Sequence, residues 1–247
     1  MNQIKRYFDI IGQLLEKERE SQKKELLKAA NLIAECIKRD GLIYIYGSGH
    51  AHISGEELFY RAGGLGNVYP VFIEPLMLHE AAVRSSQLEK EEGYLTEAFE
   101  KLPISEKDLV IIVSTSGRNA APIDAAIIAE KKGAGIITLF SREYSLSAPS
   151  GHSSGKRLMD FGDARIDNGV PAGDASLIVE GIETKVAPVS TIVNLTILQS
   201  VTVEAVSICA DSGFTSIPIF ESGNMEGGMQ HNESVLERYR QRIPFLK

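Results

Sequence analysis

Short apolar segments alternate with helical segments along most of the chain, and this alternation restricts the fold to one class. The apolar segments predict strands at 42–46, 68–73, 108–113, 136–140, 163–167 and 176–179. The segments between and after them predict helices at 53–62, 76–88, 93–102, 122–132 and 188–208. Strands that alternate with helices form a parallel sheet with helices on both faces. We therefore predict an α/β fold, a three-layer sandwich with a mostly parallel sheet flanked by helices.

One strand ends in a turn whose composition favours an anion. The apolar run 109–113 stops at Ser114-Thr115-Ser116-Gly117, and a helix is predicted to begin near Asn119 and Pro122, because Asn caps helices and Pro is tolerated in their first turn. The free N–H groups at a helix N-terminus attract negative charge, and three hydroxyls add neutral donors. The residues alone predict a phosphate site at this turn. The alternative is that the hydroxyls merely cap the helix.

A second turn, Gly47-Ser48-Gly49-His50, follows the first predicted strand. Its glycines permit a sharp bend and a close approach of the backbone to a ligand. His52 stands where a dinucleotide fingerprint requires a third glycine, and the Walker pattern is absent, so neither nucleotide site is expected. His50 and His52 with Glu56 could form a metal site, but this spacing is not diagnostic. We predict no metal and no cofactor, and expect one His to contact the ligand, or else to cap or stack at the helix start.

Composition and charge exclude some classes of binding partner. The net charge is −7 without a dense basic run, which argues against nucleic acid. Cys36 and Cys209 lie in apolar helical patterns and are predicted to be buried thiols. The N-terminus lacks a signal core, and no apolar run approaches ~18 residues, so we predict a cytoplasmic protein with no membrane partner.

The chain is predicted to form a single domain (1–247), with N-terminal helices at 1–39, an α/β core at 40–212 and a C-terminal extension at 213–247. Apolar residues recur at helical spacing from Ile4 through Phe8, Ile11 and Leu15. This segment is either one long helix with the next or a hairpin broken near Ser21. A long apolar stripe ahead of the first strand favours a dimerisation arm over a helix that only packs on the sheet, so we predict a homodimer or a higher homo-oligomer.

The two strand–turn–helix units, 43–64 and 110–141, resemble the SIS (sugar isomerase) domain. The N-terminal helices and Ala187-Pro-Val-Ser-Thr-Ile192 with its following helix also fit, so the likeness covers about residues 1–212. Within the family the chain is most similar to the phosphoheptose-isomerase-like branch. The serine-rich turn is specific for the domain and poorly specific for the reaction.

The resemblance implies a bound sugar phosphate. It places the phosphate on Ser114, Thr115 and Ser116, with Asn119 nearby. The family usually has another hydroxyl shortly after the first glycine turn, where this chain has Ala51. Other substrate-binding candidates at the first turn are Ser48, Gly49 and His50. The residues themselves add Lys156, in the loop His152–Arg157, which is either a lid that closes over the phosphate or a mobile solvated loop.

The resemblance also implies proton transfer through an enediol, with a Glu and a His as base and acid. Glu57 is the favoured base and Glu56 the other candidate, although both have ordinary roles as solvated helix carboxylates. His231 could reach a site from a neighbouring subunit or be a plain surface residue. The predicted activity is aldose–ketose isomerisation of a phosphosugar. The alternatives are a non-catalytic sugar-phosphate sensor, or a lyase or deaminase acting on an amino-sugar phosphate.

Overall fold

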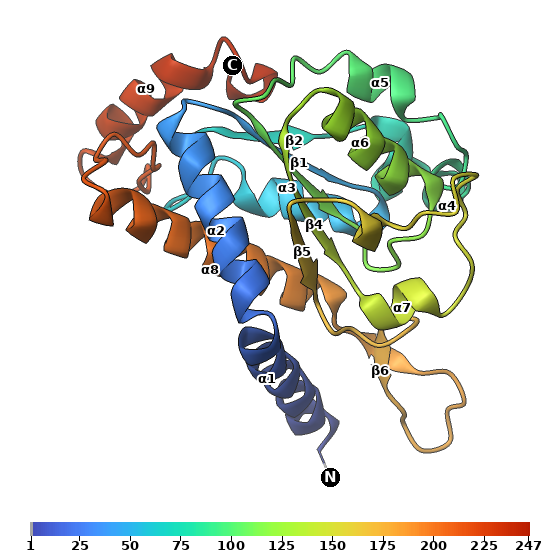
Figure 1. Cartoon of the computed structure of the whole chain (residues 1–247). Helices are drawn as coiled ribbons and strands as arrows, with labels where there is room; N and C mark the ends of the chain where they lie inside the picture. The colour runs from blue at the N-terminus through green and yellow to red at the C-terminus, as the bar shows by residue number, and fades with distance from the viewer. Residues whose placement is uncertain (1) are drawn as a thin grey trace.

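The computed structural model describes residues 2–247 and has a five-stranded parallel sheet at its centre (Figure 1). The strand order is β2-β1-β3-β4-β5, and neighbouring strands pair in parallel throughout. The strands are β1 (Ile43–Gly47), β2 (Val68–Val71), β3 (Leu109–Val113), β4 (Gly135–Phe140) and β5 (Ala164–Asp167). The predicted α/β class and its parallel sheet are confirmed. The apolar runs of β1 and β3 are buried on both faces, whereas the edge strand β5 is buried only at alternate residues.

Helices cover both faces of the sheet and make the three layers. Alternate residues of β1 show the division: Ile43 and Ile45 pack with one group of helices, and Tyr44 and Tyr46 with the other. The first group is α2 (Lys23–Lys38), α3 (Ile53–Leu58) and α8 (Ser190–Asp211). The second is α4 (Leu78–Leu88), α5 (Thr96–Glu100) and α6 (Ala120–Lys131).

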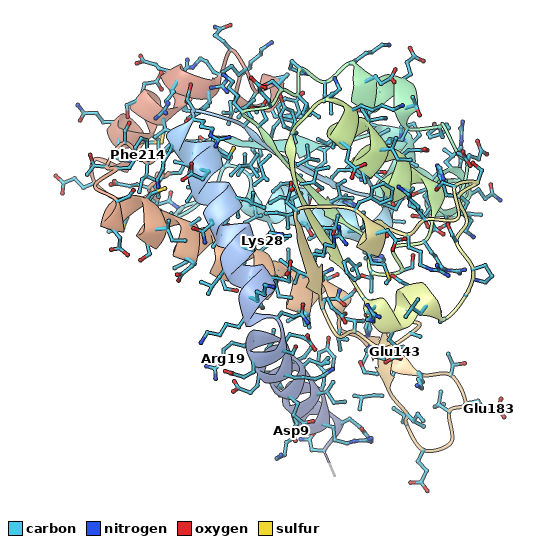
Figure 2. The ribbon with its side chains drawn as sticks, in the orientation of Figure 1. Asp9, Arg19, Lys28, Glu143, Glu183 and Phe214 are labelled. Carbon is cyan, nitrogen blue, oxygen red and sulfur yellow. The ribbon has the colours of Figure 1, made fainter. Side chains whose placement is uncertain are left out.

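The N-terminal helix α1 (Gln3–Ser21) continues α2 end to end, with a break at Gln22, and projects beyond the body of the molecule (Figure 1). Of the two arrangements that the sequence left open, the structure therefore has neither an unbroken helix nor a folded-back hairpin. Figure 2 labels Asp9 and Arg19 on this arm and Lys28 on α2. The Tyr7 hydroxyl fastens the arm by donating to the Pro188 carbonyl oxygen at 2.7 Å.

The last predicted strand lies outside the main sheet. β6 (Ala175–Leu177) pairs antiparallel with β7 (Val186–Pro188), which the sequence did not predict, and Glu183 lies in the loop between them (Figure 2). These strands are short and partly exposed, so they lack the continuous apolar run that identified the core strands. The strand predicted at 176–179 is therefore present as β6, outside the parallel sheet.

Several helices are shorter than predicted. The helix predicted over 53–62 ends at Leu58, because Tyr60 takes a left-handed φ of 43° and Gly63 donates its N–H to the Phe220 carbonyl of the C-terminal segment. Pro75 begins a 3-10 turn (Glu74–Leu76) rather than α4 itself. The remaining elements are 3-10 turns at Gly49–His52, Leu158–Asp160 and Pro244–Leu246, and helices α7 (Arg142–Leu146) and α9 (Gly228–Tyr239).

Helix α8 is apolar enough, by length and composition alone, to resemble a membrane span, with a mean hydropathy of 1.6. It lies against α2 and α3, and its inward side chains, including Val193 and Leu198, belong to the core. Packing in the core accounts for part of this composition, while Val203 on the outer side is 69% exposed.

Candidate functional site

The two turns singled out in the sequence lie side by side at the carboxyl edge of the sheet. Gly47, the last residue of β1, pairs with Val113, the last residue of β3, so Ser48 and Ser114 leave the sheet at the same level. The chain runs from β1 outward to β2 in one direction and to β3 in the other, and ligands of open α/β sheets bind at such a reversal. A cavity of about 420 Å³ opens there.

The serine-rich turn forms one wall of this cavity. Gly117 has a φ of +58°, and its N–H donates to the Ser114 Oγ at 3.2 Å, which closes the turn and leaves Thr115 and Ser116 lining the cavity. Asn119 takes the extended backbone of an N-cap before α6, yet its side chain caps nothing. The Ala121 N–H already donates to a backbone carbonyl, so the N-terminus of α6 has fewer free N–H groups than the sequence predicts. The hydroxyls of the serine-rich turn are therefore the more important donors to an anion.

Glu89, the residue after α4, is the one carboxylate of the cavity that both turns hold. Its Oε2 accepts from the Ser48 hydroxyl at 2.8 Å, and its Oε1 accepts from the Asn119 amide at 2.8 Å. Burial raises the pKa of Glu89, against the opposing effects of the Ser48 hydrogen bond and of Lys90. A raised pKa suits a carboxyl group that takes and returns a proton near neutral pH.

Tyr46, on β1, has a buried hydroxyl that feels the charge of this carboxylate. The hydroxyl has no hydrogen-bond partner among residues 2–247, and the ring packs edge-on against Phe99. Burial raises the pKa of Tyr46, and the charge of Glu89 raises it further, so this phenol stays neutral.

Two cations line the cavity near Glu89. Arg118 follows the serine-rich turn and Lys90 follows Glu89, and neither forms an ion pair within the part of the chain that the structure describes. The Nε of Arg118 is buried without a hydrogen-bond partner there. An anion is the ligand class that would complete these groups.

The start of α8 forms the other side of the cavity. Asp174, which has a left-handed φ of 67°, accepts from the N–H groups of Val189 and Ser190 at 3.0 and 2.8 Å and from the Ser190 hydroxyl at 2.7 Å. It therefore caps α8 from outside the helix. Ser190, Thr191 and Asn194 of this helix line the cavity.

Comparisons with known proteins identify the family of this chain. Residues 6–141, more than half of the chain, match the SIS domain family. The chain belongs to the SIS domain family. Among relatives in this family, a UPF0309 protein of Geobacillus sp. strain WCH70 is 45% identical over 98% of each chain, and one of Listeria monocytogenes is 44% identical over the same shares.

Solved SIS structures share the fold at low identity. A phosphoheptose isomerase from Francisella tularensis superposes with a TM-score of 0.54 at 14% identity, covering 82% of this chain and 96% of that one. The phosphoheptose isomerase GmhA of Neisseria gonorrhoeae gives 0.51 at 14% identity, covering 84% and 97%. These likenesses concern the fold alone.

In this SIS protein most of the predicted binding residues line one cavity. The strand register explains their convergence, because both turns leave the same edge of the sheet. Those brought together are Ser48, Gly49, His50, Ser114, Thr115, Ser116 and Asn119. Ala51 lines the same cavity, so the hydroxyl usual in the family is missing from its wall.

The predicted catalytic carboxylates lie elsewhere on the SIS core. Glu57 is paired with Arg61 and accepts from the Gln199 amide at 3.1 Å, in a shallow depression along α8. Glu56 lies 3.3 Å from the Nε2 of His52. The structure does not bring either carboxylate into the cavity, because α3 directs this pair toward α8 and solvent.

His231 and Lys156 also lie outside the cavity. The Nε2 of His231, on α9, is 2.8 Å from the Ile219 carbonyl oxygen. Lys156 is stacked over the Phe161 ring, 4.9 Å from its centre. Within the loop His152–Arg157, the Ser153 N–H donates to the Glu92 Oε2 at 2.8 Å.

Sequence reasoning missed Glu89, Arg118 and Asn194. Glu89 stands in the charged run Glu89-Lys-Glu-Glu92, which is typical of a solvated helix end. Only its position directly after the buried Leu88 distinguishes it, and that signal is weak. Within residues 2–247, no group of three or more His, Cys, Asp or Glu is arranged to hold a metal ion.

Proposed function

We propose that this SIS protein binds a sugar phosphate in the cavity and interconverts its aldose and ketose forms through an enediol. The observation that carries the proposal is Glu89, a carboxyl group with a raised pKa that is held by hydrogen bonds from Ser48 of one turn and from Asn119 after the other. The fold shared with two phosphoheptose isomerases supports the same class of reaction.

The phosphate is proposed to bind Thr115 and Ser116, with Arg118 and Lys90 neutralising its charge. The sugar then extends across Glu89, which takes the C2 proton as a base and returns it to C1 as an acid. This assignment replaces Glu57, Glu56 and His231, which lie outside the cavity of a single chain. Arg118 likewise replaces Lys156 as the cation.

A sugar-phosphate sensor is the second candidate, and one observation favours it. Both carboxylate oxygens of Glu89 already accept hydrogen bonds from the protein, as they would in a group that only braces the two turns. A sensor needs the same cavity and the same anion site, but transfers no proton.

The test begins with thermal unfolding against a panel of aldose and ketose phosphates. A ligand at one hundred times its Kd adds about 2.7 kcal/mol of stability. For a chain of this length that raises the melting temperature by roughly 5–10 °C. Ser116→Ala should weaken this shift, and an unchanged shift would exclude the phosphate placement.

Each stabilising sugar phosphate is then incubated in deuterated water, and exchange of its C2 proton is followed by NMR. The isomerase proposal expects exchange by the wild type, loss in Glu89→Gln and retention in the matched control Glu91→Gln, which changes an exposed neighbouring carboxylate. Stabilisation without exchange would identify the sensor.

We also propose that the protein is a homodimer that uses α1 as its arm. The arm projects from the body (Figure 1), and the side chains of Ile4 and Phe8 are 67% and 73% exposed. Exposed apolar side chains on a projecting helix are typical of a surface that a partner covers.

A further inference from the structure

Two asparagines are buried where β5 and α8 meet behind the cavity. Asn168, directly after β5, is completely buried, and Asn194, in the second turn of α8, is 3% exposed. The Asn168 Nδ2 donates to the Asn194 Oδ1 at 2.7 Å. Burial of two amide side chains costs free energy unless their polar atoms find partners, so this pair requires an explanation.

A backbone donor fixes the direction of this hydrogen bond. The Val170 N–H donates to the Asn168 side chain at 3.1 Å, and an N–H can only point at an acceptor, so that atom is Oδ1. The Nδ2 of Asn168 must then face Asn194, which meets it with its own Oδ1. The remaining polar atom of the pair is therefore the Asn194 Nδ2, with two N–H donors.

This last nitrogen is the unsatisfied end of the pair. It forms no hydrogen bond with any residue in 2–247, yet it is not sealed within the protein, and Asn194 lines the cavity. The Asn194 amide thus presents a fixed donor to the cavity from the α8 side. Glu89 lines the cavity from α4, held by the two turns.

We propose that Asn194 donates a hydrogen bond from Nδ2 to the carbonyl oxygen of the open-chain sugar phosphate, and that Asn168 is the positioning residue that keeps this donor turned toward it. The proposal rests on the isomerase function above and names the group that would stabilise its enediolate. A donor oriented before the reaction stabilises an oxyanion without reorganising, which is where such groups contribute most.

The electron flow requires a donor at this oxygen. When the Glu89 carboxylate removes the C2 proton, the C2–H electrons form the C1–C2 double bond and the carbonyl electron pair moves onto O1, which becomes the oxyanion. In the second half of the reaction O1 takes a proton from solvent, and the O2 hydroxyl gives its proton to solvent. The O2 electrons form the new carbonyl as Glu89 returns its proton to C1.

The test separates carbonyl recognition from phosphate recognition with two ligands. The first is whichever aldose or ketose phosphate the wild type exchanges, and the second is 1,5-anhydroglucitol 6-phosphate, which has a phosphate and hydroxyls but no carbonyl. Asn194→Ala should lower the turnover rate of C2 exchange by roughly 10²–10³-fold, the usual loss for one oxyanion donor. Its Kd for the anhydro sugar should stay within about twofold. Thr196→Ala, on the exposed side of α8, is the matched control and should change neither.

Asn168→Ala tests the positioning without touching the cavity wall. It removes the Nδ2 that donates to the Asn194 Oδ1, so the Asn194 amide is no longer held with its own Nδ2 toward the cavity. Exchange should fall as in Asn194→Ala, while binding of the anhydro sugar, which also reports correct folding, is retained.

Each outcome decides the proposal. Wild-type rates of exchange in Asn194→Ala overturn it and leave the isomerase function intact. Equal loss of exchange and of anhydro-sugar binding also overturns it, because the role is then structural. A wild type that exchanges no sugar phosphate overturns both. Loss of exchange with retained binding, in both variants, supports it.

Discussion

Gly117→Ala should destabilise the protein by about 0.5–3 kcal/mol, because the serine-rich turn leaves no room for a side chain. The φ of +58° alone costs a non-glycine residue roughly 1–2 kcal/mol. A Cβ at this position would lie 2.8 Å from the Ser145 Oγ, whose hydroxyl donates to the Ser116 carbonyl at 2.7 Å. Losing that hydrogen bond costs about 0.5–1.5 kcal/mol. In the opposite direction, alanine restricts the unfolded chain, which stabilises the folded state by about 0.4–1 kcal/mol.

Urea unfolding measures this cost, and Gly155→Ala is its matched control. Gly155 has a similar φ of +70°, but a Cβ there meets nothing within 4 Å, so this variant carries only the backbone strain. We expect Gly117→Ala to be the less stable of the two by about 0.5–1.5 kcal/mol, the value of one hydrogen bond. It should also bind sugar phosphate more weakly, because Ser116 shifts. Equal unfolding free energies would refute the tight packing of the turn.

Four further outcomes are expected. Because the pKa of Glu89 is raised in the folded state, its ionisation lowers stability as pH rises through that raised pKa. Glu89→Gln should therefore unfold at a higher temperature than wild type near pH 7. In a pH–rate profile of wild-type exchange, the acid limb should lie above the ordinary pKa range of Glu. Asp174→Ala should cost roughly 1–2 kcal/mol in urea unfolding by uncapping α8, and Asp174→Asn less. Burial raises the pKa of Cys36 to about 12, so a thiol reagent at pH 8 should modify it only in denaturant. Phe8→Ser should shift the mass measured by light scattering from dimer to monomer, and a wild-type monomer would exclude the arm.

The sheet was predictable because burial of a strand produces an apolar pattern in the local sequence. β1 and β3 are buried at every residue, whereas β5 is buried and apolar only at alternate residues, and the five observed strands fall within one or two residues of the predicted ones. The hairpin β6–β7 left a weaker mark, since its strands are three residues long and partly exposed. Helix ends were less predictable. Helix α3 stops at Leu58 because a distant segment supplies the carbonyl for Gly63, a contact that no local pattern records.

The residues of the candidate site likewise divide into those with a local sequence signal and those without one. Ser114, Thr115 and Ser116 were predictable because a hydroxyl turn directly after a buried strand is a local signal. Glu89 and Asn194 were not, because each reaches the cavity only through the path of a helix across the sheet. Glu57 misled the prediction, because a helix that follows a glycine turn by sequence can still direct its carboxylates away from that turn.

An acidic chain can bind an anion here because the cavity's electrostatics are set locally. The net charge is −7, but charges beyond a Debye length of about 8 Å are largely screened at physiological salt. Within that range a bound anion would meet the turn hydroxyls and two cations that form no ion pair in residues 2–247. Asp174, the second carboxylate of the cavity wall, accepts from two backbone N–H groups and the Ser190 hydroxyl, which partly offset its charge. Glu89 accepts from only two side-chain donors, so its charge is the less compensated of the two. Repulsion from that anion would raise the pKa of Glu89 further, so phosphate binding and the readiness of Glu89 to hold a transferred proton reinforce each other.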